Sequence, residues 1–277
     1  MKKVKSKIPF NYLTIKTTKS RIEKGLLAIP VSLISMFSQN NNKIYIINEL
    51  GEEEIKKFTP YKSSSRECRI GGLKNFYKRN AVVSGDEIVV QLLDDLRYRI
   101  IPEKKFKTQV CQIESQLDNS SDDTETKQSI SRLVEVLNLS EEIVLKNEFV
   151  RLSNKVIPNR KMKLTVNSKT KENVSPSLRK ILLSLYKGHC QLTNFTFFMK
   201  NGNPYFEIHH INSERGNHFK NLLVVSPNIH AQFTYANLEQ FFDRDGWLRK
   251  VIINNHEYKV KQCIDDLPRS FEKEVHF

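Results

Sequence analysis

Two short apolar runs that carry histidines limit the fold of this chain more than any other feature. Residues 207–211 (EIHHI) and 221–225 (NLLVV) both read as strands, and the polar stretch 212–220 (NSERGNHFK) between them reads as a loop. A third histidine, His230, follows the second run, and the sequence from there to about residue 242 predicts a helix. The three segments therefore predict two strands followed by a helix.

The adjacent histidines are the first candidates for chemistry. Because successive residues of a strand point to opposite faces, His209 and His210 serve one site only if the strand end bends or if they flank the reacting phosphate. Hydrolysis of a phosphodiester needs a base, a cation and a group that orients the base. A neutral imidazole, with a pKa of about 6.5, can act as ligand or as base. Asn221 cannot ionise, so it can orient a histidine without competing for protons.

The run 203–211 (NPYFEIHHI), with Asn221 and His230 behind it, resembles the HNH (ββα-metal) nuclease family, in particular the HNH domains of McrA-like restriction enzymes. The resemblance covers about residues 175–242 and implies metal-assisted cleavage of DNA by water. Mg²⁺ is the cation that we expect, with Mn²⁺ as the alternative. By this resemblance the metal ligands are His209 and His230, the general base is His210, and the orienting residue is Asn221.

Many members of that family carry two cysteine pairs that hold a structural zinc. Here the corresponding stretches read 190–193 (CQLT) and 226–229 (SPNI), so Cys190 is the one expected thiolate that remains. A single cysteine cannot hold a tetrahedral zinc ion. We therefore expect no structural zinc, and apolar packing in its place by Leu192, Phe195, Phe197 and Ile229.

The first hundred or so residues read mostly as strands. Residues rich in β-formers occur at 26–30, 43–47, 87–93 and 97–101, and turn sequences such as 84–86 (SGD) bound them. Short helices are predicted over 31–37 and 73–79. Many short strands with short helices predict a β-barrel or pseudobarrel.

Segments 26–30 (LLAIP), 69–73 (RIGGL) and 83–90 (VSGDEIVV) resemble the plant B-three-like pseudobarrel that serves as the recognition domain of EcoRII-type restriction enzymes. Such domains grip the major groove of DNA with two arms, and the matching stretches here are 17–23 and 61–69. The side chains suited to guanine edges or phosphates are Lys19, Arg21, Lys62, Ser64, Arg66 and Arg69. For each of these residues taken singly, a solvated basic surface is the alternative.

The composition shifts at about residue 114, where the polar, acidic stretch 114–127 predicts a linker. Apolar residues then recur at helical spacing, and Ser140 can cap a second helix over 141–149. This helical pair is interpreted either as a domain-docking element or as a dimer contact. The recurring apolar residues are Ile130, Leu133, Val134 and Leu137.

The basic stretch 159–171 is expected to be an exposed connector, with one short edge strand as the alternative. Ser175 and Pro176 then suit the start of a helix, because the hydroxyl can accept an N–H and proline needs none there. We therefore expect an α+β protein in three parts. These are a B-three-like recognition pseudobarrel over 1–113, a linker and helical connector over 114–173, and an HNH nuclease domain over 174–277.

Charge and composition narrow the choice of partner. Lysine and arginine number 45 against 31 acidic residues, which gives a net charge of +14 and suits a polyanion. The most apolar stretch, 26–37, is interrupted by Pro30, and no run approaches the ~18 apolar residues of a membrane span. The four cysteines show no C-x-x-C pair, and the first ten residues do not predict an export signal. We therefore expect reduced, buried thiols, a cytoplasmic location and no membrane partner.

Together these observations predict a sequence-specific restriction-type endonuclease that binds double-stranded DNA. One HNH site cuts one strand, so a homodimer is expected for a double-strand break. Two alternatives remain open: a modification-dependent restriction enzyme that requires methylcytosine, and a non-cutting DNA-binding regulator with an inactive HNH fold. RNA is the least favoured target, because the sequence predicts no aromatic platform for single strands.

Overall fold

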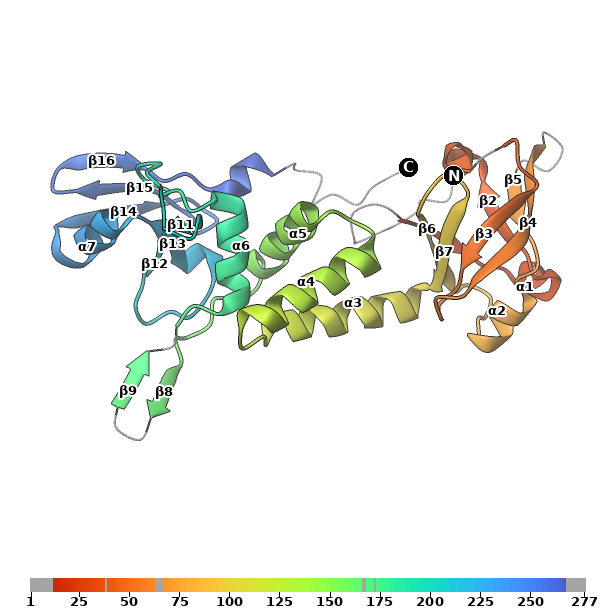
Figure 1. Ribbon diagram of the computed structural model, residues 1–277, viewed down its shortest axis with the longest axis horizontal. Coiled ribbons are helices and arrows are strands. Elements are labelled where there is room, and N and C mark those ends of the chain that lie inside the picture. Colours follow the sequence, from red (N-terminus) through yellow and green to blue (C-terminus); the bar gives the residue numbers. More distant parts are fainter. Residues whose placement is uncertain (1–11, 38, 63–66, 166–167, 172, 268–277) are drawn as a thin grey trace. The chain divides into compact units, whose positions relative to one another are not determined.

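The computed structural model describes residues 12–37, 39–62, 67–165, 168–171 and 173–267 of the chain (Figure 1). The chain divides into two compact units. The first contains the described residues of Met1–Glu114 together with Glu135–Leu139, and the second those of Ser115–Val134 and Ser140–Phe271. No helix of the described residues has the length and apolar character needed to cross a membrane.

A nearly closed seven-stranded sheet forms the first unit, in the order β1-β6-β7-β3-β4-β5-β2. Its neighbours pair antiparallel except β3 and β7, and the two end strands, β1 and β2, contact each other. This arrangement confirms the predicted pseudobarrel. The strands are β1 (Tyr12–Lys16), β2 (Leu27–Pro30), β3 (Lys43–Ile47), β4 (Glu53–Lys62), β5 (Glu67–Ile70), β6 (Glu87–Leu92) and β7 (Arg97–Pro102). The short helices are α1 (Lys19–Lys24), the 3₁₀ helix η1 (Val31–Met36) and α2 (Lys74–Arg79).

The interior of this sheet is filled by aliphatic and aromatic side chains. Phe37 stacks on Phe58 and on Tyr98, with ring centroids 5.7 and 4.6 Å apart, and the Tyr98 hydroxyl donates to the Met36 carbonyl. Inward-facing residues such as Ile44 are fully buried. Closure of the sheet therefore gives a small unit a continuous core, which an open sheet of short strands would lack.

The predicted linker at 114–127 is wrong for most of its length. Helix α3 (Glu103–Asp118) runs into it and α4 (Asp123–Leu137) begins within it, so only 119–122 connect the two. The Asp122 carboxylate accepts the N–H groups of Thr124 and Glu125, at 2.7 and 2.9 Å, and so caps α4. Leu117 and Thr126 are buried. A polar sequence therefore forms helix here because its caps and a few buried positions stabilise it.

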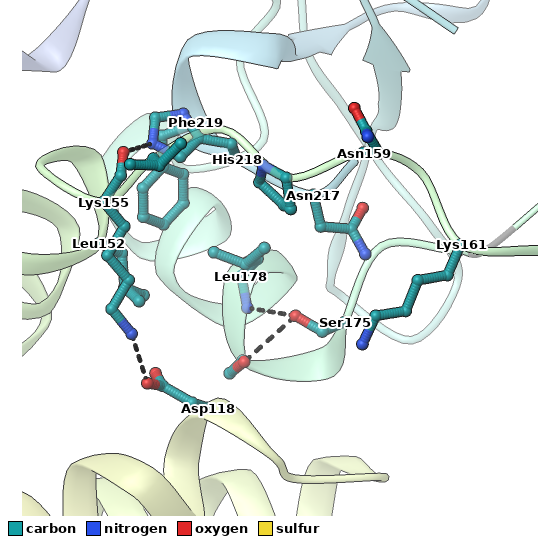
Figure 2. Close-up of a pocket in the computed structure, with 13 residues that line it drawn as sticks. Asp118, Leu152, Lys155, Asn159, Lys161, Ser175, Leu178, Asn217, His218 and Phe219 are labelled. Carbon is teal, nitrogen blue, oxygen red and sulfur yellow. Dashed lines mark hydrogen bonds and ion pairs between the residues drawn. The ribbon is translucent and has the colours of Figure 1, made fainter. Parts of the chain in front are cut away.

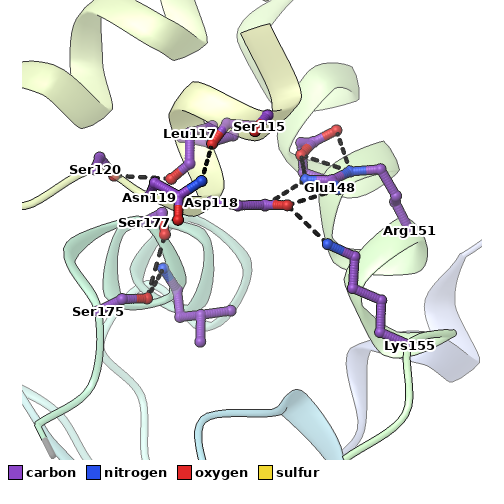
Figure 3. A network of polar contacts seen from close by, with 11 residues as sticks. Ser115, Leu117, Asp118, Asn119, Ser120, Glu148, Arg151, Lys155, Ser175 and Ser177 are labelled. Atoms are coloured by element: carbon purple, nitrogen blue, oxygen red, sulfur yellow. Dashed lines mark hydrogen bonds and ion pairs between the residues drawn. The ribbon is translucent and has the colours of Figure 1, made fainter. Parts of the chain in front are cut away.

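Helix α5 (Glu141–Ser153) begins as predicted, with the Ser140 hydroxyl accepting the Ile143 N–H. Figure 3 shows how it is tied to the end of α3. Arg151 donates to both Asp118 carboxylate oxygens, at 2.6 and 3.1 Å, and to Glu148, while Lys155 lies 2.7 Å from Asp118. Burial raises the pKa of Glu148; for Asp118 burial opposes ionisation, but the hydrogen bonds from Arg151 and Lys155 outweigh it and lower the pKa.

The basic stretch predicted as a connector forms a two-stranded hairpin, β8 (Met162–Thr165) with β9 (Ser168–Lys171). Helix α6 (Pro176–Tyr186) follows, and Ser175 caps it as predicted. Among the cysteines, three are buried as expected, whereas Cys111 is exposed, because it lies on the outward face of α3.

Two strands followed by a helix form the centre of the second unit, as predicted. Strand β12 (Glu207–His210) pairs antiparallel with β13 (Leu222–Val225), and α7 (Pro227–Tyr235) follows. The short hairpin β10 (Phe197–Phe198) with β11 (Pro204–Tyr205) precedes β12, and the 3₁₀ helix η2 (Phe219–Asn221) precedes β13. Leu223, Val225, Ile229 and Phe233 pack in the core between them.

The helix predicted to continue to about residue 242 is shorter in the structure, where α7 ends at Tyr235. Ala236 is extended (φ −95°, ψ 165°), and β14 (Leu238–Phe242) pairs with β15 (Leu248–Ile253) and through it with β16 (His256–Lys259). Asn254 and Asn255 both have positive φ and make the tight turn between β15 and β16. Pairing with a neighbouring strand overrides the local pattern of 238–242. The 3₁₀ helix η3 (Cys263–Asp266) closes the described chain.

Candidate active site and nucleic-acid interface

The two histidines predicted as metal ligands lie together. His209 is on β12 and His230 on α7, with ring centroids 5.2 Å apart, and His209 also contacts the Phe233 ring at 4.5 Å. Burial, with the nearby charges of His230 and His210, lowers the pKa of His209 to about 4. The His209 ring is therefore neutral at physiological pH, which is the form that binds metals.

Glu207 holds His230 in place. Its Oε2 accepts from His230 Nδ1 at 2.5 Å, and its Oε1 accepts the Tyr205 hydroxyl at 2.9 Å. The hydrogen bond from His230 lowers the pKa of Glu207. A carboxylate on one ring nitrogen is the usual support of a histidine ligand, and it leaves Nε2 as the coordinating nitrogen. The sequence contained the signal, because Glu207 and His209 are two residues apart in a strand and so share a face.

A divalent cation at this pair of imidazoles stays a prediction. Within the described residues no group of three or more histidine, cysteine, aspartate or glutamate side chains is arranged to hold a metal. His209 and His230 would therefore supply two ligands, and water or phosphate oxygens the rest. Imidazole suits transition metals better than Mg²⁺, which prefers carboxylate and water oxygens.

His210 has different neighbours from His209, as the alternation of a strand predicts. Its Nε2 lies 3.0 Å from Oδ1 of Asn217 in the loop between β12 and β13. The predicted base His210 and the predicted ligand His209 thus lie side by side on one short strand, whereas the second predicted ligand, His230, lies on α7.

The Asn221 side chain holds this loop. It is 2% exposed; its Nδ2 donates to the carbonyls of Asn212, Arg215 and Gly216, and its Oδ1 accepts the Asn212 N–H at 2.9 Å. The structure therefore brings the Asn221 amide to the loop main chain and places the Asn217 amide at the His210 ring.

His218 lies in the polar loop between β12 and β13, yet it is buried. It is 4% exposed, with Nε2 3.0 Å from the Lys155 carbonyl and Nδ1 accepting the Lys220 N–H. Figure 2 shows it at the edge of a cavity of about 410 Å³ that Asn217 and Lys161 also line. Burial lowers the pKa of His218. Its role is to join the loop to the end of α5.

The aromatic packing expected in place of zinc is only partly observed. Cys190 and Ile229 are buried with Leu192 partly buried beside them, but Phe195 and Phe197 are 53% and 42% exposed. Phe197 instead stacks on Tyr205, with centroids 5.2 Å apart, because the β10–β11 hairpin pairs the two residues. Phe195 and Phe197, which were predicted to be buried, therefore lie at the surface.

In the first unit, two of the predicted DNA-contacting arginines meet on one carboxylate. Arg21 Nη2 lies 2.5 Å from Glu67 Oε2, and Arg69 Nε lies 2.8 Å from Glu67 Oε1. Lys19 on α1 is exposed, and Lys62 is the last residue of β4. Ser64 and Arg66 lie outside the described residues. The ion pairs join the two predicted arms, and sequence reasoning missed Glu67 because no spacing rule links it to Arg21.

Replacing Glu67 with glutamine should strengthen binding to non-specific DNA severalfold. The change frees the charges of Arg21 and Arg69 from their internal partner, so the slope of log K against log salt should steepen by about one. Fluorescence anisotropy at several salt concentrations measures both. Asp95→Asn is the control, because it removes one exposed carboxylate elsewhere in the unit. Equal responses of the two variants would show that Glu67 acts only through net charge.

Comparisons with known proteins give no family assignment. No protein-family model matches the chain, and no curated protein matches its sequence. A hypothetical Arabidopsis thaliana protein, At1g16640.1, covers 33% of this chain and 87% of its own, with 15% identity and a TM-score of 0.28. The match to the Arabidopsis FUS3–DNA complex covers 32% of this chain and 92% of the other chain, with 17% identity and a TM-score of 0.27. Scores of this size do not establish a common fold, so both family resemblances stay predictions.

Proposed function

We propose that the chain is a sequence-specific DNA endonuclease of restriction type that hydrolyses phosphodiester bonds with a divalent cation. The observation that carries this proposal is the arrangement of three histidines, two on strand β12 and one on helix α7. His209 and His230 face each other at 5.2 Å, and His210 is held separately by the following loop.

Each residue has a distinct part in the proposed reaction. His210 would accept a proton from the attacking water, while His209 and His230 would hold the cation and Glu207 would orient His230. The cation, when bound, would neutralise charge that develops on the phosphate. The first unit would bind the duplex through Lys19, Arg21 and Arg69. Two copies of the chain would together cut both strands.

Removing the cation ligand His230 should abolish cleavage and weaken metal binding together. In a plasmid assay the wild-type protein should nick or linearise DNA with Mg²⁺, Mn²⁺, Co²⁺ or Ni²⁺ and lose activity with chelator, and His230→Ala should be inactive with all four. Calorimetric titration with Mn²⁺ should show weaker binding by the variant. His256→Ala, which changes an exposed histidine on β16, is the matched control.

Parallel digestion of methylated and unmethylated DNA separates the restriction types, and sequencing the ends gives the site and stagger. DNA binding by the wild-type protein without cleavage under any metal would overturn the enzymatic proposal and favour the regulator. Cleavage that persists in chelator would exclude the metal role of His209 and His230.

A further inference from the structure

The Asn217 side chain bridges the His210 ring to another segment of the chain. Its Oδ1 lies 3.0 Å from His210 Nε2, and its Nδ2 donates to the Asn173 carbonyl at 2.8 Å. Asn173 lies two residues before Ser175, which caps α6. Asn217 therefore fixes the ring relative to the start of a helix.

These two bonds show what the Asn217 amide requires of the His210 ring. The Asn173 carbonyl can only accept, so the NH₂ group of Asn217 must face it and the amide oxygen must face the ring. An amide oxygen also only accepts, so His210 Nε2 must donate. In the neutral ring the other nitrogen, Nδ1, is then the basic one.

We propose that Asn217 is the positioning residue of the nuclease site: it locks His210 in the Nε2–H tautomer and so presents Nδ1 as the proton acceptor. This inference rests on the proposed function, because it assigns a base only if His210 is one. The loop itself is held by Asn221, whose four hydrogen bonds go to the main chain of residues 212–216. Asn217 is thus left to act on the ring.

The cleavage test compares two near-isosteric changes. Asn217→Leu removes the acceptor, and we expect kcat to fall about 10- to 100-fold with KM little changed. Asn217→Asp keeps an acceptor oxygen at the ring, although it loses the bond to the Asn173 carbonyl and adds a negative charge beside the imidazole, so it should restore most of the rate. Asn212→Ala, an exposed side chain in the same loop, is the control. Equal losses in the Leu and Asp variants, or no loss in either, would overturn the inference.

A second readout does not depend on cleavage. Nitrogen chemical shifts of the His210 ring in the metal-free, ¹⁵N-labelled protein, followed to the high-pH plateau at which they no longer change, report the tautomer of the neutral ring directly. The wild-type and Asn217→Asp proteins should show Nε2–H, and Asn217→Leu a mixture. A wild-type Nδ1–H ring would refute the inference even if the enzyme cuts DNA. Absence of cleavage with an Nε2–H ring would instead count against the proposed function alone.

Discussion

His210→Ala should lower DNA cleavage by a factor of about 10² to 10⁴ and leave DNA binding nearly unchanged. The variant removes the proposed proton acceptor but none of the basic groups of the first unit. The His210 ring is hydrogen-bonded to the Asn217 side chain. The loop main chain is held by the Asn221 amide, which does not depend on this ring, so the loop should keep its conformation in the variant. Single-turnover cleavage with saturating Mn²⁺, together with anisotropy for binding, measures the two effects separately.

His256→Ala serves again as the histidine control. If freshly purified His210→Ala protein cut DNA at the wild-type rate in the presence of metal, His210 would be excluded as the base. Loss of binding in step with loss of cleavage would mean that His210 contacts DNA without accepting the proton.

Asn221→Ala should destabilise the second unit by about 3 kcal/mol, which is among the larger effects of a single polar substitution. The change leaves the carbonyls of Asn212, Arg215 and Gly216, and the Asn212 N–H, without their buried partner. Urea unfolding followed by fluorescence measures it, because Trp247, the only tryptophan of the chain, is buried in this unit.

Asn212→Ala is the matched control for stability. Its exposed side chain accepts one hydrogen bond, from the Glu214 N–H, and should cost less than about 1 kcal/mol. If Asn221→Ala unfolded at the same urea concentration as the wild type, the loop would have to be held by contacts other than the Asn221 amide.

Regular alternation and capping made part of the fold predictable. Strand 43–47 has the predicted bounds, the Ser175–Pro176 start of α6 is correct, and the two strands and helix around His209 and His230 are present. In each case the pattern needs only the local chain and one buried face. The pseudobarrel was also predictable, because short strands with frequent turns have few other ways to form a core.

The sequence-based predictions fail where contacts with residues far away in the sequence determine the local structure. Strand β4 reads EEIKKFTPYK, and Ile55 in it is 62% exposed, so pairing with β3 and β5 defines it as a strand more than its own pattern does. Residues 238–242 become a strand only because β15 lies beside them. Asn217 gave no signal of its own, because its contact with Asn173 spans 44 residues.

Under the proposed function, the Arg21–Glu67–Arg69 ion pairs would have a kinetic consequence for the search along DNA. Any random phosphate that approaches these guanidinium groups has to replace a carboxylate already in place. Weak encounters with DNA would therefore be released quickly, and only a site that offers additional contacts would hold the protein for long. The internal anion would shorten the time spent on unrelated DNA, which speeds the search, at the cost of some strength in the final complex.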